Sequence, residues 1–111
     1  MHIKEYNVTE TTVENMNLQQ LSKLCHDTAV EKGFWDQERN IGEALMLIVT
    51  ELAEAMESYR VEDHDNFRVE IADTFIRLFD LCGGLNIDIA KEIEKKAAKN
   101  KKRPYKHGKI C

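Results

Sequence analysis

The sequence contains very few residues that interrupt helices, with one proline and five glycines in 111 residues. Proline and glycine are the strongest local breakers of regular structure, so their scarcity predicts long uninterrupted helices and an all-α fold. A chain of this length is expected to form a single domain, residues 1–111. Within it we expect an irregular N-terminal arm over residues 1–16 and a polar C-terminal tail over residues 104–111.

Long hydrophobic runs are also missing. No segment approaches the roughly 20 apolar residues that a membrane span requires, and the first five residues lack the apolar core of a signal peptide. Cys25, Cys82 and Cys111 form no CxxC pattern and no Cys/His spacing typical of a metal site. We therefore expect a cytoplasmic protein with reduced thiols and no membrane partner.

Charge is present in abundance but is unevenly distributed. Residues 91–109 carry nine Lys or Arg against two acids, a local charge of +7, whereas the other segments carry seven bases and eighteen acids, or −11. A basic patch is typical of nucleic-acid binders. The same asymmetry also fits an acidic metal site combined with cations that bind phosphate, and composition alone leaves both interpretations open.

Four segments have the apolar spacing of amphipathic helices. Asn17 is followed by Gln20, and Asn40 by Glu43, which is the spacing of an N-cap residue and the third helical position. We expect the third helix to stop at the Gly83-Gly84 pair. The predicted helices span residues 18–32, 41–60, 67–81 and 87–100.

The third predicted helix is apolar around most of its circumference, apart from a narrow stripe formed by Glu70, Asp73, Arg77 and Asp80. One neighbour within the chain cannot cover so wide an apolar arc. The short polar connection over residues 61–66 makes the second and third helices antiparallel neighbours. We therefore predict an antiparallel four-helix-type bundle completed by homo-oligomerisation, as a homodimer or homotetramer.

Two pairs of acids, Glu51 with Glu54 and Glu70 with Asp73, are each spaced three residues apart, so both members of a pair point the same way from a helix. Four carboxylates that converge need a cation or protons to compensate them. Oxygen ligands select a hard divalent ion, and we expect Mg²⁺, with Mn²⁺ as the alternative. A di-iron centre would require Glu-x-x-His pairs, which are missing here.

Glu51 is the most informative single residue of this set. Its neighbours on the helix include four apolar residues, and a carboxylate in an apolar arc is unfavourable without a partner. The alternative is that both pairs are ordinary solvated acids, with Arg77 neutralising the third helix. The apolar neighbours of Glu51 are Ala44, Leu47, Ile48 and Ala55.

With these motifs the chain resembles the all-α nucleoside triphosphate pyrophosphohydrolases of the MazG type. That family has an E-x-x-E helix followed by E-x-x-D on the next helix, which the two acid pairs match. The stretch Gly33-Phe34-Trp35 is also similar to relatives in this group, and the resemblance covers about residues 18–107. Near the C-terminus, the family's Lys, Asn and Arg, spaced about one turn apart, correspond to Lys96, Asn100 and Arg103.

One position departs from the family pattern. Many members carry a further Glu directly before the first motif, where this chain has Thr50. The acid that could bind a second ion or orient water is therefore missing, which puts two-metal operation in doubt.

The resemblance implies Mg²⁺-dependent hydrolysis of a nucleoside triphosphate between its α and β phosphates, giving the monophosphate and pyrophosphate, in nucleotide-pool house-cleaning. The metal ligands would be Glu51, Glu54, Glu70 and Asp73. Glu54 lies nearest the polar side of its helix and would also act as the catalytic base for the attacking water. Lys96 and Arg103 would bind phosphate, and Asn100 would reach phosphate or ribose oxygens.

Two further residues are expected to bind substrate. Trp35, or its neighbour Phe34, offers a stacking surface for the base, although a hydrophobic plug over the helix ends is the alternative for Trp35. Asp80 lies two turns beyond Asp73 and is expected to contact sugar or base, with a salt bridge to Arg77 or simple exposure as its alternatives.

Two other functions remain open at this stage. A non-catalytic helical interaction module would use the acidic stripe to dock a basic partner and the apolar excess as a dimer seam. A phosphoribosyl-ATP pyrophosphohydrolase would differ only in its substrate. Nucleic acid is not expected as a partner, because the Lys-rich segment has little aromatic interleaving beyond Tyr105.

Overall fold

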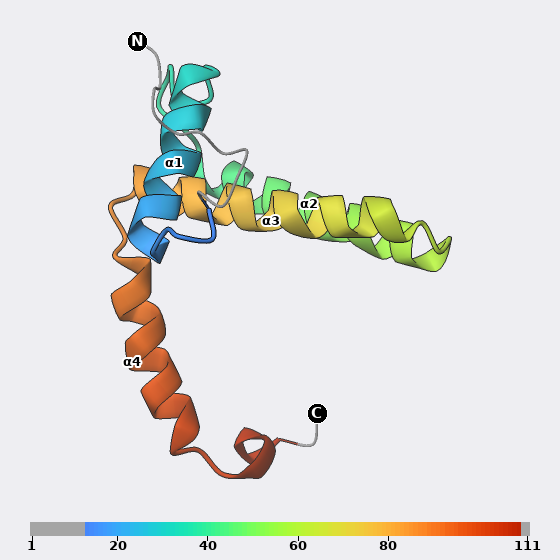
Figure 1. Ribbon diagram of the computed structural model, residues 1–111, viewed down its shortest axis with the longest axis vertical. Helices are drawn as coiled ribbons and strands as arrows, with labels where there is room; N and C mark the ends of the chain where they lie inside the picture. The colour runs from blue at the N-terminus through green and yellow to red at the C-terminus, as the bar shows by residue number, and fades with distance from the viewer. Residues whose placement is uncertain (1–12, 110–111) are drawn as a thin grey trace.

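The computed structural model describes residues 13–109. All helices and turns of this part belong to one all-α architecture, as predicted, and no strand is found in it. The elements are α1 (Leu18–Glu31), α2 (Ile41–Arg60), α3 (His64–Gly84) and α4 (Ile89–Lys101), followed by a 3₁₀ turn at Tyr105–Gly108 (Figure 1). Most of the predicted N-terminal arm, and the last two residues of the predicted tail, lie outside the described residues.

The starts of α1 and α2 follow from their caps. The Asn17 side chain accepts a hydrogen bond from the Gln20 backbone N–H at 2.8 Å, and the Gln20 side chain accepts one from the Asn17 N–H at 2.9 Å. This reciprocal pair is a capping box, which satisfies two backbone donors that the helix itself leaves unpaired. At the start of α2, Asn40 accepts from the Glu43 N–H at 2.9 Å. Both predicted starts are confirmed.

The boundaries of α3 were predicted wrongly at both ends. The helix starts at His64, three residues earlier than expected, because Asp63 caps it by accepting from the Asn66 N–H at 3.1 Å. It continues through Gly83 and Gly84. A Cβ atom on Gly83 would collide with the side chain of His26, and one on Gly84 with the Trp35 ring. The glycines therefore allow a close approach and do not end the helix.

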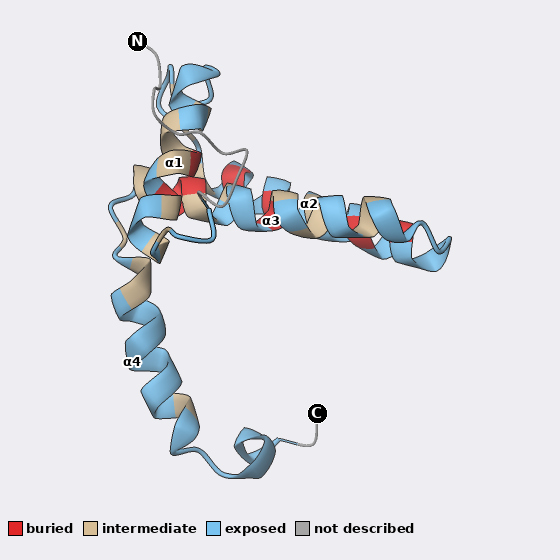
Figure 2. Cartoon of the chain, in the orientation of Figure 1, coloured by how far each residue is buried: buried red, intermediate tan, exposed pale blue. Residues whose placement is uncertain are grey.

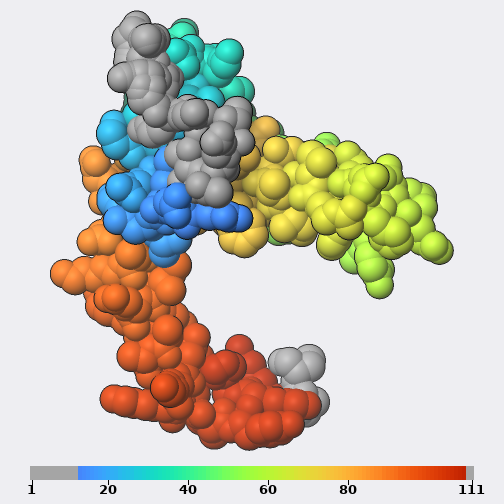
Figure 3. Space-filling model, in the orientation of Figure 1, coloured from blue at the N-terminus to red at the C-terminus, as the bar shows by residue number. Residues whose placement is uncertain are grey.

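Helices α2 and α3 form an antiparallel hairpin, and α1 packs across α3 near one end of it (Figure 1). Helix α4 leaves from the same corner and runs away from the hairpin, with α1 as its main contact. The space between α4 and the hairpin is open in the space-filling view (Figure 3). A single chain therefore does not close into a four-helix bundle. Helix α4 does not pack along the hairpin, and none of its residues is buried.

The seam between α2 and α3 is small and partly polar. Ser58 is buried there, and its hydroxyl accepts a hydrogen bond from Asn66 Nδ2 at 2.7 Å. Glu51 lies on the same side of α2 as the buried residues of that helix and contacts α3. The buried residues of α2 are Ala44, Ile48, Ala55 and Ser58.

Most large apolar residues of α2, by contrast, are exposed (Figure 2). Ile48 is the one large apolar residue of α2 that is buried. Leu52 is 47% exposed and Met56 is 58% exposed. The exposed apolar residues of α2 are Leu45, Met46, Leu47, Val49, Leu52, Met56 and Tyr59.

A second apolar surface lies between α1 and α3. A groove of about 450 Å³ there is lined almost entirely by apolar side chains, including Leu21, Leu24, Phe75, Ile76 and Phe79. Over residues 13–109, none of the helices is both long enough and apolar enough to cross a membrane.

Candidate metal site

Three of the four predicted metal ligands come together at the middle of the hairpin. Glu51 on α2 and Glu70 and Asp73 on α3 each offer a carboxylate oxygen, and these oxygens lie within 4.8 Å of one another. The antiparallel hairpin produces this arrangement, because both acids of α3 are one turn apart and face the same segment of α2. Among the described residues, no other group of three or more His, Cys, Asp or Glu side chains reaches this spacing.

Glu51 has the partner that its apolar surroundings demand. Its Oε2 accepts a hydrogen bond of 2.7 Å from Arg77 Nε, and its side chain is 12% exposed. This bond lowers the pKa of Glu51 below its ordinary value, against the opposing effect of partial burial. Arg77 was expected to neutralise acids of its own helix, α3. Its ion pair instead crosses to Glu51 on α2.

Glu70 is the least satisfied member of the cluster. Its Oε1 atom is buried and, within residues 13–109, has no hydrogen-bond partner. Its Oε2 has only a long contact of 3.4 Å from Asn66 Nδ2. The facing carboxylate of Glu51 raises the pKa of Glu70 above its ordinary value, assisted by partial burial and by the charge of Glu54. A proton or a cation would relieve this repulsion.

Glu54 is exposed and is not a member of the close cluster, although its charge acts on Glu70. Thr50 is exposed as well, and its hydroxyl donates to the Met46 carbonyl one turn earlier at 3.1 Å. The hydroxyl therefore bonds within its own helix.

The donor set fits a hard divalent cation. It consists of carboxylate oxygens, one of which is buried without a partner. In octahedral coordination at about 2.0–2.1 Å, ligand oxygens lie roughly 3–4 Å apart. The observed limit of 4.8 Å is somewhat wider, so small side-chain rotations would bring the three oxygens to ligating distance.

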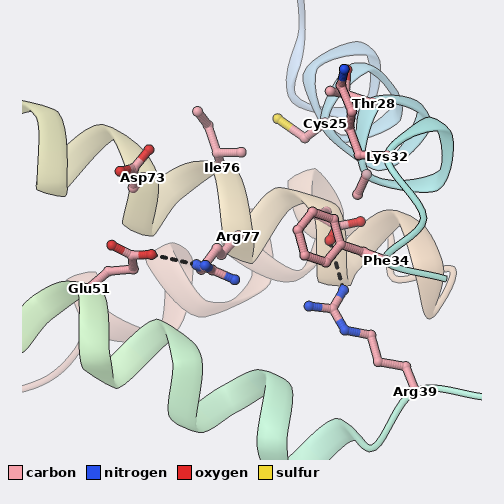
Figure 4. A pocket seen from close by; sticks show the side chains of 11 residues that line it. Cys25, Thr28, Lys32, Phe34, Arg39, Glu51, Asp73, Ile76 and Arg77 are labelled. Atoms are coloured by element: carbon pink, nitrogen blue, oxygen red, sulfur yellow. Dashed lines mark hydrogen bonds and ion pairs between the residues drawn. The ribbon is translucent and has the colours of Figure 1, made fainter.

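A cavity of about 250 Å³ opens beside the cluster (Figure 4). Acids of the cluster lie at one end, and Arg77 stands between them and a region lined by α1 and by the segment that joins α1 to α2. The cavity combines anionic, cationic and aromatic side chains. Its lining includes Lys32, Phe34, Arg39, Glu51, Asp73 and Arg77.

Asp80 organises the far wall of this cavity. It is 6% exposed, and its Oδ1 accepts from Trp35 Nε1 at 2.9 Å and lies 3.0 Å from His26 Nδ1. Its Oδ2 accepts from Arg39 Nη1 at 3.0 Å. The predicted alternatives for Asp80, a bridge to Arg77 or simple exposure, are both wrong, because its cationic partner is Arg39.

Trp35 is fixed by the same network. Its ring is half-buried against Gly84 and meets the His26 ring edge-on, with ring centroids 5.0 Å apart. The guanidinium of Arg39 lies 4.9 Å from the Trp35 ring centroid. These contacts agree with the plug over the helix ends and leave Phe34, which is 56% exposed, as the more accessible aromatic surface.

The predicted phosphate ligands are not brought to the acid cluster by this chain. Lys96 is exposed on α4, and Arg103 is exposed just after it. Asn100 is half-buried, and its Oδ1 has no hydrogen-bond partner among the described residues. Helix α4 runs away from the hairpin, so the segment that carries these three residues diverges from the hairpin that carries the cluster (Figure 1).

The described cysteines are poor nucleophiles. Cys25 and Cys82 are both buried free thiols. Burial, together with the charge of Asp80, raises the pKa of Cys25 to about 11, and burial also raises the pKa of Cys82. A thiol that stays protonated is a weak nucleophile, so cysteine chemistry is not expected at this cavity.

Lys32 and Arg39 were missed by the sequence interpretation, although both line the cavity. Arg39 precedes the cap of α2 and follows two aromatics, which was a usable signal, since arginine commonly stacks on aromatic rings. Lys32 carried no signal in its spacing.

Comparison of the chain with protein-family models, with curated proteins and with solved structures finds no match.

Proposed function

We propose that this protein is a Mg²⁺-dependent nucleoside triphosphate pyrophosphohydrolase, which converts a nucleoside triphosphate to the monophosphate and pyrophosphate. One observation carries the proposal. Carboxylates from two helices converge within 4.8 Å, one of their oxygens is buried without a partner, and a cavity with cationic and aromatic walls begins beside them. An all-oxygen site of this kind, adjacent to cations, suits a metal–phosphate complex.

Glu51, Glu70 and Asp73 would hold the ion, with Glu54 joining them from the edge of the cluster. The bound ion would neutralise charge on the phosphate oxygens and orient the attacking water. Glu54 is exposed and its charge acts on Glu70, and it would accept the proton of that water. The water oxygen forms the new bond to phosphorus, the α–β anhydride bond breaks, and the proton passes from Glu54 to solvent.

A second copy of the chain would complete the site. The cavity of about 250 Å³ is smaller than the roughly 300–1,000 Å³ of typical small-molecule sites. Helix α4 carries the predicted phosphate ligands away from its own hairpin, and α2 exposes a broad apolar side. Association through that side would close a four-helix-type bundle and would bring Lys96, Asn100 and Arg103 of one protomer toward the acids of its partner.

The test is a pyrophosphate-release screen with Mg²⁺ over common and modified ribo- and deoxyribonucleoside triphosphates, with phosphoribosyl-ATP included. The substitution Glu54→Gln removes the proposed base, so we expect at least about a hundredfold loss of turnover. Glu57→Gln is the matched control, because Glu57 is exposed on the same helix and is not a member of the cluster. It should retain activity, and both variants should keep the far-UV spectrum of the parent.

The exposed apolar surfaces also favour one other function, a non-catalytic helical module that docks partners through them. The two candidates differ in a simple measurement. An enzyme of the proposed class should release pyrophosphate from at least one nucleotide and should be thermally stabilised by Mg²⁺ or Mn²⁺. Absence of both effects would refute the hydrolase and support the module.

A further inference from the structure

Arg77 occupies the boundary between the acid cluster and the cavity. Its Nε donates to Glu51 Oε2 at 2.7 Å, and both residues line the cavity. The side chains are 31% exposed for Arg77 and 12% exposed for Glu51, so the pair is partly shielded from water. Figure 4 shows the guanidinium lying toward Glu51, with Asp73 one turn away on the same helix.

This contact competes with metal binding for a carboxylate that belongs to the cluster. A guanidinium that donates a short, charge-assisted hydrogen bond already neutralises Glu51. A divalent ion bound by the same three acids would then lie within a few ångströms of a fixed positive charge, which is strongly unfavourable at low effective dielectric. Loading of the site therefore favours a longer or broken Arg77 contact.

We propose that Arg77 is the internal counter-ion of the free site, and that on metal loading it transfers from Glu51 to a phosphate of the arriving substrate. This inference rests on the proposed function and adds a residue and an order of events to it. The transfer is short, because Arg77 already borders the cavity. A guanidinium suits the new role, since its planar fork binds phosphate oxygens in pairs.

The charges around Arg77 support a phosphate as the second partner. Lys32 and Arg39 line the same cavity on the side away from the acids, so its lining carries two cations besides Arg77. Arg39 is held by Asp80 at 3.0 Å, whereas Arg77 has its described hydrogen bond to Glu51. Arg77 is thus the cation of this group whose partner is itself a proposed metal ligand.

The first experiment titrates Mn²⁺ alone into the full chain, by calorimetry or by electron paramagnetic resonance. In Arg77→Met the competitor is gone, so Mn²⁺ should bind at least about tenfold more tightly than in the parent. Arg77→Lys keeps a positive charge without the Nε contact and should fall between the two. Arg68→Met removes the same charge from the same helix at an exposed position, 68% accessible, and should behave like the parent.

The second experiment titrates inorganic pyrophosphate, a probe that is independent of the base, at saturating Mn²⁺. Loss of the guanidinium should weaken pyrophosphate binding about tenfold or more in Arg77→Met, with partial rescue in Arg77→Lys. The two effects have opposite signs, tighter metal and weaker phosphate. A merely structural role for Arg77 would weaken both together.

The outcomes separate this inference from the proposed function. If the parent binds Mn²⁺ and releases pyrophosphate, but Arg77→Met matches Arg68→Met in both titrations, the transfer is refuted and the hydrolase stands. If the parent neither binds Mn²⁺ nor turns over any nucleotide, the proposed function fails and this inference fails with it. Should Arg77→Met not fold by circular dichroism, Arg77→Lys decides: unchanged affinities for both probes refute the transfer.

Discussion

The network around Asp80 makes a prediction that is independent of any catalytic role. Asp80→Asn keeps the shape of the side chain but removes the charge that holds Arg39, Trp35 and His26. Asp80 is 6% exposed and the Arg39 side chain is 14% exposed, so the guanidinium would be left almost buried and without its counter-charge.

Breaking a buried ion pair by removing one partner destabilises a protein by about 3–5 kcal/mol. Asparagine retains one acceptor oxygen, so the lower end applies, a loss of about 3 kcal/mol in the free energy of unfolding. For a domain of this size, roughly 4 °C of melting temperature is lost per kcal/mol, which gives a fall of about 12 °C. Urea denaturation at one fixed protein concentration measures the effect, because association also contributes to apparent stability.

Asp65→Asn is the matched control. The same chemical change is made on the same helix, at a side chain that is 94% exposed and paired with Arg68. Exposed pairs contribute about 0–1 kcal/mol, so its urea midpoint should hardly change. If Asp80→Asn loses no more stability than Asp65→Asn, then the Asp80 network does not hold the segment between α1 and α2, and the description of the cavity wall is wrong.

Two further predictions concern the acid cluster and the exposed apolar side. Glu70→Gln should raise the melting temperature at pH 7, because the raised pKa of Glu70 means that its charged form is disfavoured in the folded protein. The gain should vanish below the ordinary pKa of 4.5, where the Glu70 carboxyl of the parent is protonated in both the folded and the unfolded state. An equal gain at pH 4 and pH 7 would contradict this cause. Leu52→Lys places a charge on the exposed apolar side of α2, where Leu52 is 47% accessible, and should shift the protein to monomer in light scattering. Glu57→Gln changes the net charge by the same one unit at an exposed position of α2 and should leave the mass unchanged; an unchanged mass in Leu52→Lys would exclude that side as the interface.

The sequence predicted those features that depend on local signals. The caps Asn17 and Asn40 placed the starts of α1 and α2, because capping hydrogen bonds involve residues only three positions apart. Helical period identified Glu51 as a carboxylate on an apolar side, and this side is the one that α3 buries. Two acid pairs on antiparallel neighbours then led to the cluster that the structure contains.

Features that depend on contacts between distant segments could not be predicted in this way. Gly84 lies 49 positions after Trp35, and nothing in its local sequence shows that a ring will pack against it. The contact from Arg39 to Asp80 spans 41 positions, and the one from Arg77 to Glu51 spans 26. The direction of α4 depends on how it leaves α3, which helical periodicity does not encode.

The polar seam of the hairpin has a consequence for how this protein tolerates change. Leucine in place of Ser58, Asn66 and Glu70 would stabilise the packing of α2 against α3, because buried polar groups contribute less to stability than well-packed hydrocarbon does. The same replacements would erase the contacts that fix which turn of one helix faces which turn of the other, and would leave no room for a cation. Under selection for heat resistance alone, substitutions should therefore accumulate in this seam. Such variants should be the first to lose a function that depends on the polar groups of the seam.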